Sequence, residues 1–179
     1  MKLIVLDRDG VINFDSDQYI KSPAEWRPIP GSIEAIARLN QHGYRVAVAT
    51  NQSGIGRGLF DMATLNAIND KMMELVFRQG GRIDAIFFCP HTAAEACGCR
   101  KPRTGMLEEI AGRFHTDLKG VPSVGDSLKD LQAAEAVGAQ PILVLTGKGA
   151  KTQAQGGLPR KTLVFESLAD AARHLVAHP

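Results

Sequence analysis

Two aspartates, Asp7 and Asp9, come directly after an apolar run at residues 3–6 and directly before Gly10. A buried strand that ends in two carboxylates is typical of an α/β enzyme, in which functional groups gather at the carboxyl ends of the strands. Side chains two residues apart on an extended chain point to the same side, so the two negative charges repel each other unless a cation lies between them. The pair therefore predicts a metal site. The alternative is a pair of aspartates that cap a turn.

Later segments add the other groups that phosphoryl transfer needs. Thr50 ends a second apolar run, and Lys101 follows a stretch rich in cysteine. Asp126 and Asp130 follow a third, shorter apolar segment. An acidic nucleophile, a hydroxyl, a cation and a second acidic cluster can together move a phosphoryl group with Mg²⁺. Alone, Thr50 is more typical of a satisfied strand-end hydroxyl and Lys101 of a solvated surface lysine, so the combination makes the prediction.

Four motifs follow one another along the chain: Asp7-x-Asp9, Thr50, Lys101 and Gly125-Asp126-x-x-x-Asp130. In type and order, they resemble the motifs of the haloacid dehalogenase superfamily of phosphatases. We expect Asp7 to be the nucleophile that forms an aspartyl-phosphate. Asp9 is expected to protonate the leaving oxygen and then to accept a proton from the attacking water. Thr50 and Lys101 are expected to hold the phosphoryl oxygens, where negative charge must be stabilised in the transition state.

The expected catalytic metal is Mg²⁺, which prefers oxygen ligands and keeps several waters. Its ligands are expected to be Asp7, Asp126 and, as the resemblance implies, the backbone carbonyl of Asp9. Asp130 lies one helical turn after Asp126. It is either a group that orients the ligands or a solvated acid on a helix.

All three cysteines of the chain lie in a short loop at residues 89–99, which reads Cys89-x-His91 and then Cys97-x-Cys99. Three thiolates and one imidazole suit tetrahedral zinc, and four ligands leave no open position for catalysis, so we interpret the loop as a structural zinc site. A disulfide with one free thiol and unpaired buried cysteines are the alternatives, and a reducing compartment disfavours the disulfide. One branch of the resembled phosphatases carries such a loop directly before an Arg-Lys-Pro segment.

That branch contains heptose bisphosphate phosphatases and histidinol-phosphate phosphatases. The segment Ser53-Gly54-Ile55-x-Arg57-Gly58 resembles the heptose bisphosphate form. The resemblance therefore implies a Mg²⁺-dependent hydrolase that removes the 7-phosphate of a heptose 1,7-bisphosphate.

A bisphosphate needs a second anion site away from the reacting phosphate. Arg57 and Arg100 are the candidates, because a guanidinium can bind a phosphate through two hydrogen bonds. Each is otherwise a solvated surface arginine. The remaining expected substrate contacts are polar loop residues that can bond to sugar hydroxyls, namely Asp15, Asp17, Gln18, Asn51, Gln52 and Ser53. A merely solvated loop is the alternative for residues 15–18.

Three other functions are compatible with parts of the sequence. A histidinol-phosphate phosphatase would use the same catalytic groups, but its cationic amine would favour an acidic residue where Arg57 stands. A polynucleotide 3′-phosphatase shares the Thr-Asn-Gln and Gly-Ile-x-Arg-Gly patterns. However, a net charge of +2 with 22% charged residues is too balanced to indicate a nucleic-acid or membrane surface. A non-catalytic zinc-containing binding module is disfavoured because every catalytic residue type is retained.

Strand-like and helix-like segments alternate along the chain, which predicts an α/β fold with a doubly wound, mainly parallel sheet. The expected strands are residues 2–6, 44–49, 85–88, 122–124, 142–145 and 163–165. The expected helices are residues 32–41, 61–79, 106–114, 128–137 and a last one capped by Ser167. Residues 147–160, rich in Gly, Gln and Lys, are the only expected loose loop.

The 179 residues, 44% of them hydrophobic, suffice for one core, so we expect a single domain over residues 1–179 without a separate cap domain. The first residues read as a strand rather than a signal peptide, and no apolar run approaches membrane-spanning length. We therefore expect a cytoplasmic monomer whose partner is a small sugar bisphosphate, with no nucleic acid and no membrane.

Overall fold

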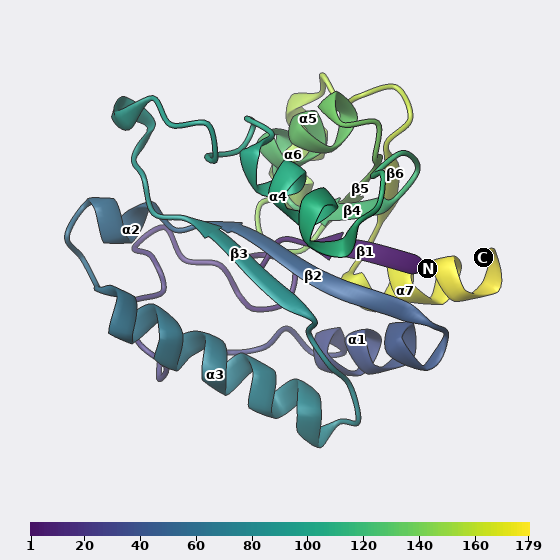
Figure 1. Ribbon diagram of the computed structural model, residues 1–179, viewed down its shortest axis with the longest axis horizontal. Helices are drawn as coiled ribbons and strands as arrows, with labels where there is room; N and C mark the ends of the chain where they lie inside the picture. Colours follow the sequence, from purple (N-terminus) through teal and green to yellow (C-terminus); the bar gives the residue numbers. More distant parts are fainter.

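Six parallel strands form one sheet in the computed structural model, which describes residues 1–179 (Figure 1). The strands are β1 (Lys2–Leu6), β2 (Tyr44–Asn51), β3 (Ala85–Cys89), β4 (Pro122–Gly125), β5 (Gln140–Val144) and β6 (Leu163–Phe165). Their order across the sheet is β3-β2-β1-β4-β5-β6. The expected doubly wound parallel sheet is thereby confirmed.

Helices cover both faces of this sheet (Figure 1). They are α1 (Ser32–Gln41), α2 (Ser53–Gly56), α3 (Met62–Arg78), α4 (Gly105–Phe114), α5 (Leu128–Ala136), α6 (Gly149–Gln155) and α7 (Leu168–Ala177), with a short 3-10 helix η1 (Ala93–Glu95). Apolar side chains of α1, α3 and α7 pack on one face, in a core that includes the buried Trp26. Those of α4 and α5 pack on the other face. Both faces of the central strands are thus buried, which explains their continuous apolar runs.

Specific side chains and one glycine determine where several helices begin and end. Asp61 caps α3, because its carboxylate accepts a hydrogen bond from the backbone N–H of Thr64 at 2.9 Å. Ser127 and Asp130 form a capping box at the start of α5. Gly43 ends the connection after α1 with a φ of +85°, a conformation that favours glycine.

The position of the site follows from the strand order. β1 lies in the middle of the sheet, and the order reverses between β1 and β4, where the chain winds outward in both directions. The backbone N–H of Asp7, just after β1, donates to the carbonyl of Val124 in β4 at 2.9 Å. Ligands of open parallel sheets bind at such a reversal, beyond the carboxyl ends of the strands. Asp7 and Asp126 are therefore brought to the same edge of the sheet.

The expected loose loop at residues 147–160 is wrong, because residues 149–155 form α6. Its composition is poor for a helix, but tertiary contacts stabilise it. Thr152 is buried, and its hydroxyl donates to the backbone carbonyl of Asp126 at 2.8 Å. The helix also needs Gly149, since a Cβ there would lie 1.7 Å from the carbonyl oxygen of Val144. Neither contact leaves a periodic pattern in the sequence. The short helices α2 and η1 were not expected either.

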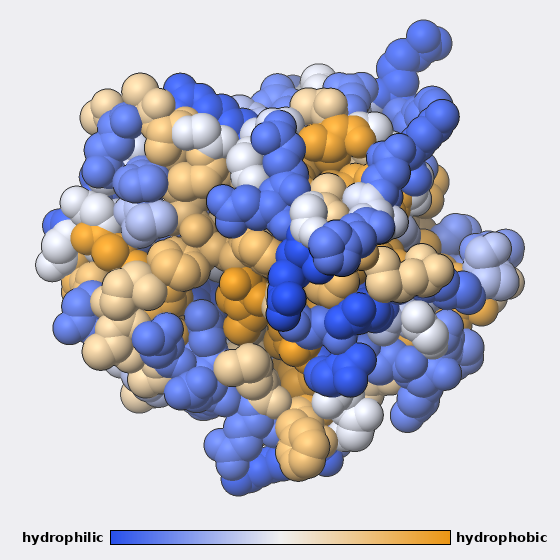
Figure 2. Space-filling model, in the orientation of Figure 1, coloured by the Kyte–Doolittle hydropathy of each residue, from blue (hydrophilic) through white to orange (hydrophobic).

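The surface in the orientation of Figure 1 mixes hydrophilic and hydrophobic residues, which alternate across the whole view (Figure 2). Large apolar side chains that are well exposed come from separate elements, such as Leu59 before α3, Phe77 at the end of α3 and Leu163 in β6. A helix long and apolar enough to span a bilayer is not present.

Candidate active site

A cavity of about 470 Å³ opens at the carboxyl ends of β1, β2 and β4. Of its 21 lining residues, only Tyr19 and Leu128 are hydrophobic. Pockets for drug-like ligands are mostly apolar, so this wall suits a small ligand rich in charges and hydroxyl groups.

Three buried or half-buried carboxylates meet at the bottom of the cavity. One oxygen each of Asp7, Asp126 and Asp130 lies within 4.8 Å of the others. Burial and the nearby carboxylate of Asp130 raise the pKa of Asp126 to about 7, and the same two causes raise the pKa of Asp7 well above its usual range. Like charges held this close in a buried site favour either protonation or a cation.

The donor set fits Mg²⁺. All three groups offer carboxylate oxygens, which are the ligands that this ion prefers, and the adjoining polar cavity leaves room for its water ligands. Asp7 and Asp126, two of the ligands expected from the sequence, are thus brought together in one group. Asp130 is a member of the same group and is 7% exposed, which excludes its reading as a solvated helix acid.

Lys101 is buried among these carboxylates instead of being a surface lysine. Its Nζ lies 2.6 Å from Oδ1 of Asp130 and 3.2 Å from Oδ1 of Asp7, and it donates to the backbone carbonyl of Ala49 at 2.8 Å. Burial acts to lower the pKa of Lys101, but the two carboxylates outweigh it and raise the pKa above its usual value. The ammonium group is therefore held charged next to the proposed nucleophile.

The carboxylate of Asp9 is held apart from this group. It accepts hydrogen bonds from Nε of Arg8 at 2.9 Å, Nδ2 of Asn13 at 3.0 Å and Nε2 of Gln52 at 3.1 Å. Burial acts to raise the pKa of Asp9, but the Arg8 guanidinium and these hydrogen bonds lower it. The cation beside this carboxylate is therefore the fully buried Arg8, which the sequence argument for a shared metal overlooked.

Two residues expected to contact substrate also connect the motifs to one another. The amide of Gln52 donates to the hydroxyl of Thr50 at 2.9 Å as well as to Asp9. The side chain of Asn51 accepts from the backbone N–H of Lys101 at 3.0 Å and donates to its carbonyl at 3.2 Å. The end of β2 thus fixes the loop that carries Lys101.

The cavity wall includes most of the other residues that the sequence assigned to the substrate. These are Asp15, Asp17, Asn51, Gln52, Ser53 and Arg100. Gln18 and Arg57 are not part of the wall. The Arg57 guanidinium lies over the ring of Tyr19, 5.9 Å from its centre, and Tyr19 itself lines the cavity.

Three lysines that were not expected from the sequence also lie in this wall, namely Lys129, Lys148 and Lys151. Nζ of Lys148 lies 3.4 Å from Asp15 and 4.0 Å from Asp17. Lys148 and Lys151 stand three residues apart at the start of α6, a spacing that places them on one side of a helix. The Gly- and Gln-rich composition of the segment hides this helical spacing in the sequence.

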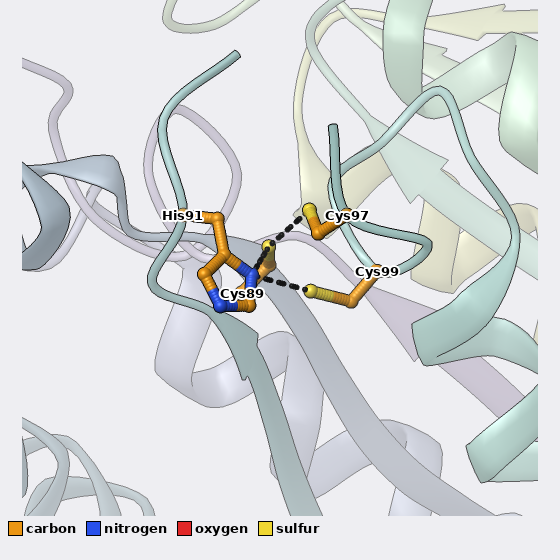
Figure 3. A group of neighbouring side chains, drawn as sticks. All are labelled: Cys89, His91, Cys97 and Cys99. Carbon is orange, nitrogen blue, oxygen red and sulfur yellow. Dashed lines mark hydrogen bonds between the residues drawn. The ribbon is translucent and has the colours of Figure 1, made fainter. Parts of the chain in front are cut away.

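Cys89, His91, Cys97 and Cys99 converge at the end of β3 (Figure 3). Sγ of Cys89 lies 3.5 Å from Nδ1 of His91 and 3.6 Å from Sγ of Cys97, and Nδ1 of His91 lies 3.3 Å from Sγ of Cys99. Tetrahedral zinc with ordinary bond lengths separates two sulfur ligands by about 3.8 Å and a sulfur and a nitrogen by about 3.6 Å. The cluster therefore fits zinc, and none of its cysteines forms a disulfide.

Comparisons with known proteins agree with this geometry. One matching family model is described as "HAD-hyrolase-like" and covers residues 98–171. Another is described as "Polynucleotide kinase 3 phosphatase" and covers residues 2–134, the part that contains the Thr-Asn-Gln pattern at 50–52.

Relatives that match nearly the whole chain are named D-glycero-beta-D-manno-heptose-1,7-bisphosphate 7-phosphatase. The protein from Bordetella bronchiseptica is 60% identical over 98% of both chains. The protein from Pseudomonas putida is 56% identical over 98% of this chain and 100% of its own. A crystal structure of D,D-heptose 1,7-bisphosphate phosphatase from B. bronchiseptica, complexed with magnesium and phosphate, has a TM-score of 0.99 and 59% identity over 100% of both chains. The chain belongs to the haloacid dehalogenase-like phosphatases, in the family of these heptose bisphosphate phosphatases.

Proposed function

We propose that this protein removes the 7-phosphate of D-glycero-beta-D-manno-heptose 1,7-bisphosphate by a Mg²⁺-dependent reaction through an aspartyl-phosphate. The observation that carries the proposal is the buried group of Asp7, Lys101, Asp126 and Asp130 at the sheet reversal. The choice of substrate is supported by the relatives named as heptose bisphosphate phosphatases, which match nearly the whole chain.

Asp7 attacks the phosphorus atom of the 7-phosphate and forms the aspartyl-phosphate, which divides the hydrolysis into two easier steps. Lys101, 3.2 Å from the Asp7 carboxylate, is placed to bind a phosphoryl oxygen as negative charge spreads over it. The Thr50 hydroxyl lines the same cavity, where Gln52 fixes its position, and binds a second phosphoryl oxygen.

Asp9 moves the proton in both steps. It protonates the leaving oxygen of the sugar, and it then accepts a proton from the water that attacks the aspartyl-phosphate. Because Arg8 lowers the pKa of Asp9, this carboxylate is ionised in the free protein and can accept a proton. A phosphate dianion beside the carboxylate raises this pKa and so favours the role of acid while the substrate is bound.

Asp7, Asp126 and the backbone carbonyl of Asp9 would hold the Mg²⁺, with Asp130 beside them. When bound, Mg²⁺ supplies positive charge for the phosphoryl oxygens and offsets the repulsion among the carboxylates. Asp130 also accepts hydrogen bonds from the backbone N–H and hydroxyl of Ser127 at 3.0 and 2.8 Å, which keeps it in place next to Lys101.

The distal 1-phosphate remains at the mouth of the cavity, where Arg100 is the main candidate to bind it. Arg100 lines the wall directly before Lys101, whereas Arg57 lies outside the wall and packs on Tyr19. Lys148 adds a half-exposed ammonium to the same wall, paired with Asp15 in the free protein. Asp15 and Asp17 are placed to bond to the sugar hydroxyls.

Histidinol phosphate stays a competing substrate for one specific reason. Asp15 and Asp17 put carboxylates in the cavity wall, and a cationic amine could pair with them. In the free protein both already face the ammonium of Lys148, which opposes this pairing.

The zinc cluster acts on the reaction indirectly. Cys99 is followed at once by Arg100 and Lys101, so a metal that fixes Cys99 also fixes the chain that carries both cations. We also propose a cytoplasmic location, because a reducing compartment keeps such cysteines free to bind a metal. We further propose a monomer with no nucleic-acid partner, in keeping with its balanced net charge of +2.

The identity and position of the released phosphate test the proposed function. Incubation with the β-1,7-bisphosphate should give inorganic phosphate and heptose 1-phosphate, because the primary 7-ester can extend to Asp7 while the anomeric phosphate stays at the mouth. Phosphorus NMR of the products distinguishes the two esters. Release of the 1-phosphate, or equal turnover of histidinol phosphate, would contradict the heptose assignment and leave only a general phosphatase.

Replacing the nucleophile should stop the reaction. Asp7→Asn keeps the shape of the side chain but cannot form the acyl-phosphate, so we expect kcat to fall by at least about 10³-fold with the fold intact. Asp70→Asn, on the exposed face of α3, is the matched control and should keep full activity. Activity of Asp7→Asn close to that of the control would rule out Asp7 as the nucleophile.

Removal of Mg²⁺ and removal of zinc should have different effects on the protein. Metal analysis of the purified protein should find one zinc per chain, and removal of Mg²⁺ should stop turnover without releasing the zinc. Removing the zinc should lower the melting temperature by roughly 10 °C and reduce activity, since the loop that carries Lys101 loses its anchor. Zinc-free protein with unchanged melting temperature and activity would refute the anchoring role.

Substitutions of the two arginines should differ in their effect. Arg100→Ala should reduce kcat/KM for the bisphosphate by about 10- to 100-fold, the value of a hydrogen-bonded charge pair, and should affect a small phosphate ester much less. Arg57→Ala should cost less, because the side chain lies outside the wall. The comparison of kcat/KM for both substrates checks this. An equal loss of kcat/KM on both substrates for Arg100→Ala would show a general catalytic role instead of recognition of the distal phosphate.

A further inference from the structure

The segment from Thr146 to Thr152, at the start of α6, surrounds the metal-binding carboxylate Asp126. The backbone N–H of Lys148 donates to Oδ2 of Asp126 at 2.9 Å. The hydroxyl of Thr152 lies 2.8 Å from the backbone carbonyl of Asp126 and 3.0 Å from that of Lys148. One short segment therefore contacts both the side chain and the main chain of Asp126.

Two glycines show how tightly the carboxylate is enclosed. A Cβ on Gly147 would lie 2.3 Å from Oδ2 of Asp126, and a Cβ on Gly10 would lie 2.0 Å from the same atom. Both glycines have positive φ, +55° and +85°. The hydroxyl of Thr146 joins the two glycine turns, because it donates to the carbonyl of Gly10 at 2.6 Å. The Asp126 side chain is thus confined between two backbone segments.

The remaining contacts of Asp126 leave one oxygen free for a cation. Its backbone N–H donates to Oδ2 of Asp130 at 3.2 Å, and its carbonyl and Oδ2 face Thr152 and Lys148. Oδ1 accepts no hydrogen bond from the protein. A carboxylate fixed in this way needs little rearrangement to bind a metal ion, and groups that orient metal ligands typically change metal affinity strongly when removed.

We propose that Thr152, together with the backbone N–H of Lys148, is a positioning residue that sets the orientation of Asp126 for Mg²⁺. This inference rests on the proposed function, because it takes Asp126 as a magnesium ligand. Thr152 is 7% exposed and lies eight residues beyond the end of β5, outside the four motifs that identify the family.

Removal of the hydroxyl alone tests the proposal. Thr152→Val keeps the size and branching of the side chain, and we expect the dissociation constant of Mg²⁺ to rise by about 10-fold. Isothermal titration calorimetry of the substrate-free enzyme with MgCl₂ measures this directly. At saturating Mg²⁺, KM for the bisphosphate should stay within about two-fold of wild type, whereas the Mg²⁺ concentration for half-maximal activity should rise with the dissociation constant. Thr152→Ser restores the hydroxyl and should restore the affinity.

Thr162→Val is the matched control, because the buried hydroxyl of Thr162 has no hydrogen-bond partner. Its Mg²⁺ affinity should equal that of wild type. If Thr152→Val does not fold, Thr152→Ala, which only removes atoms, carries the same expectation. Unchanged Mg²⁺ affinity in the folded variant, equal weakening in Thr162→Val, or failure of Thr152→Ser to restore affinity would overturn the proposal.

The same experiment separates this inference from the proposed function. If wild type binds Mg²⁺ and Thr152→Val binds it equally well, only the role of Thr152 fails. If Thr152→Val weakens binding but the heptose bisphosphate is not hydrolysed, only the proposed substrate fails. Wild-type protein that binds no Mg²⁺ would overturn both.

Discussion

The site depends on the buried ion pairs that the ammonium group of Lys101 forms. This group lies between Asp7 and Asp130, with Asp126 close by, so that three carboxylates surround a single cation. Removal of one partner from a buried ion pair typically costs about 3–5 kcal/mol, because the other charge is left uncompensated. The excess of negative charge also explains why the group needs a divalent cation to be fully ionised. The proposed phosphate binding, the proposed metal binding and the local stability therefore depend on the same few atoms.

Much of the surrounding structure keeps Lys101 in this position. Asn51 at the end of β2 binds both backbone groups of Lys101, and the carbonyl of Ala49 accepts from its Nζ. On the preceding side, the chain leaves the Cys and His cluster at Cys99, two residues away. Fixing a lysine side chain costs conformational entropy, and these contacts offset that cost. The end of β2 holds Lys101 from one side, and we propose that the Cys and His cluster, which directly precedes Arg100 and Lys101 in the sequence, holds it from the other.

The sequence was sufficient for the parts of the molecule that have a local signal. Apolar periodicity predicted α1 and the central strands. The motifs predicted that Asp7, Lys101 and Asp126 act together, and the three residues line one cavity. The sequence was insufficient where tertiary contacts decide the outcome. A Gly-rich, Gln-rich segment forms α6 because Thr152 and Gly149 fit against neighbouring strand ends, and no propensity scale contains that fit. Arg8 was overlooked for the same reason, since only packing shows that it is buried beside Asp9.

The segment around α6 also connects the wall of the cavity with the group of carboxylates that would hold Mg²⁺. The backbone N–H of Lys148 donates to Oδ2 of Asp126, and its Nζ lies 3.4 Å from Oδ2 of Asp15 in the cavity wall. One residue therefore contacts both the group of carboxylates and the wall. An anionic group that enters the mouth competes with Asp15 for the same ammonium, because opposite charges at this distance attract each other. The wall of the cavity and the geometry of Asp126 are thus linked through Lys148 at the start of α6.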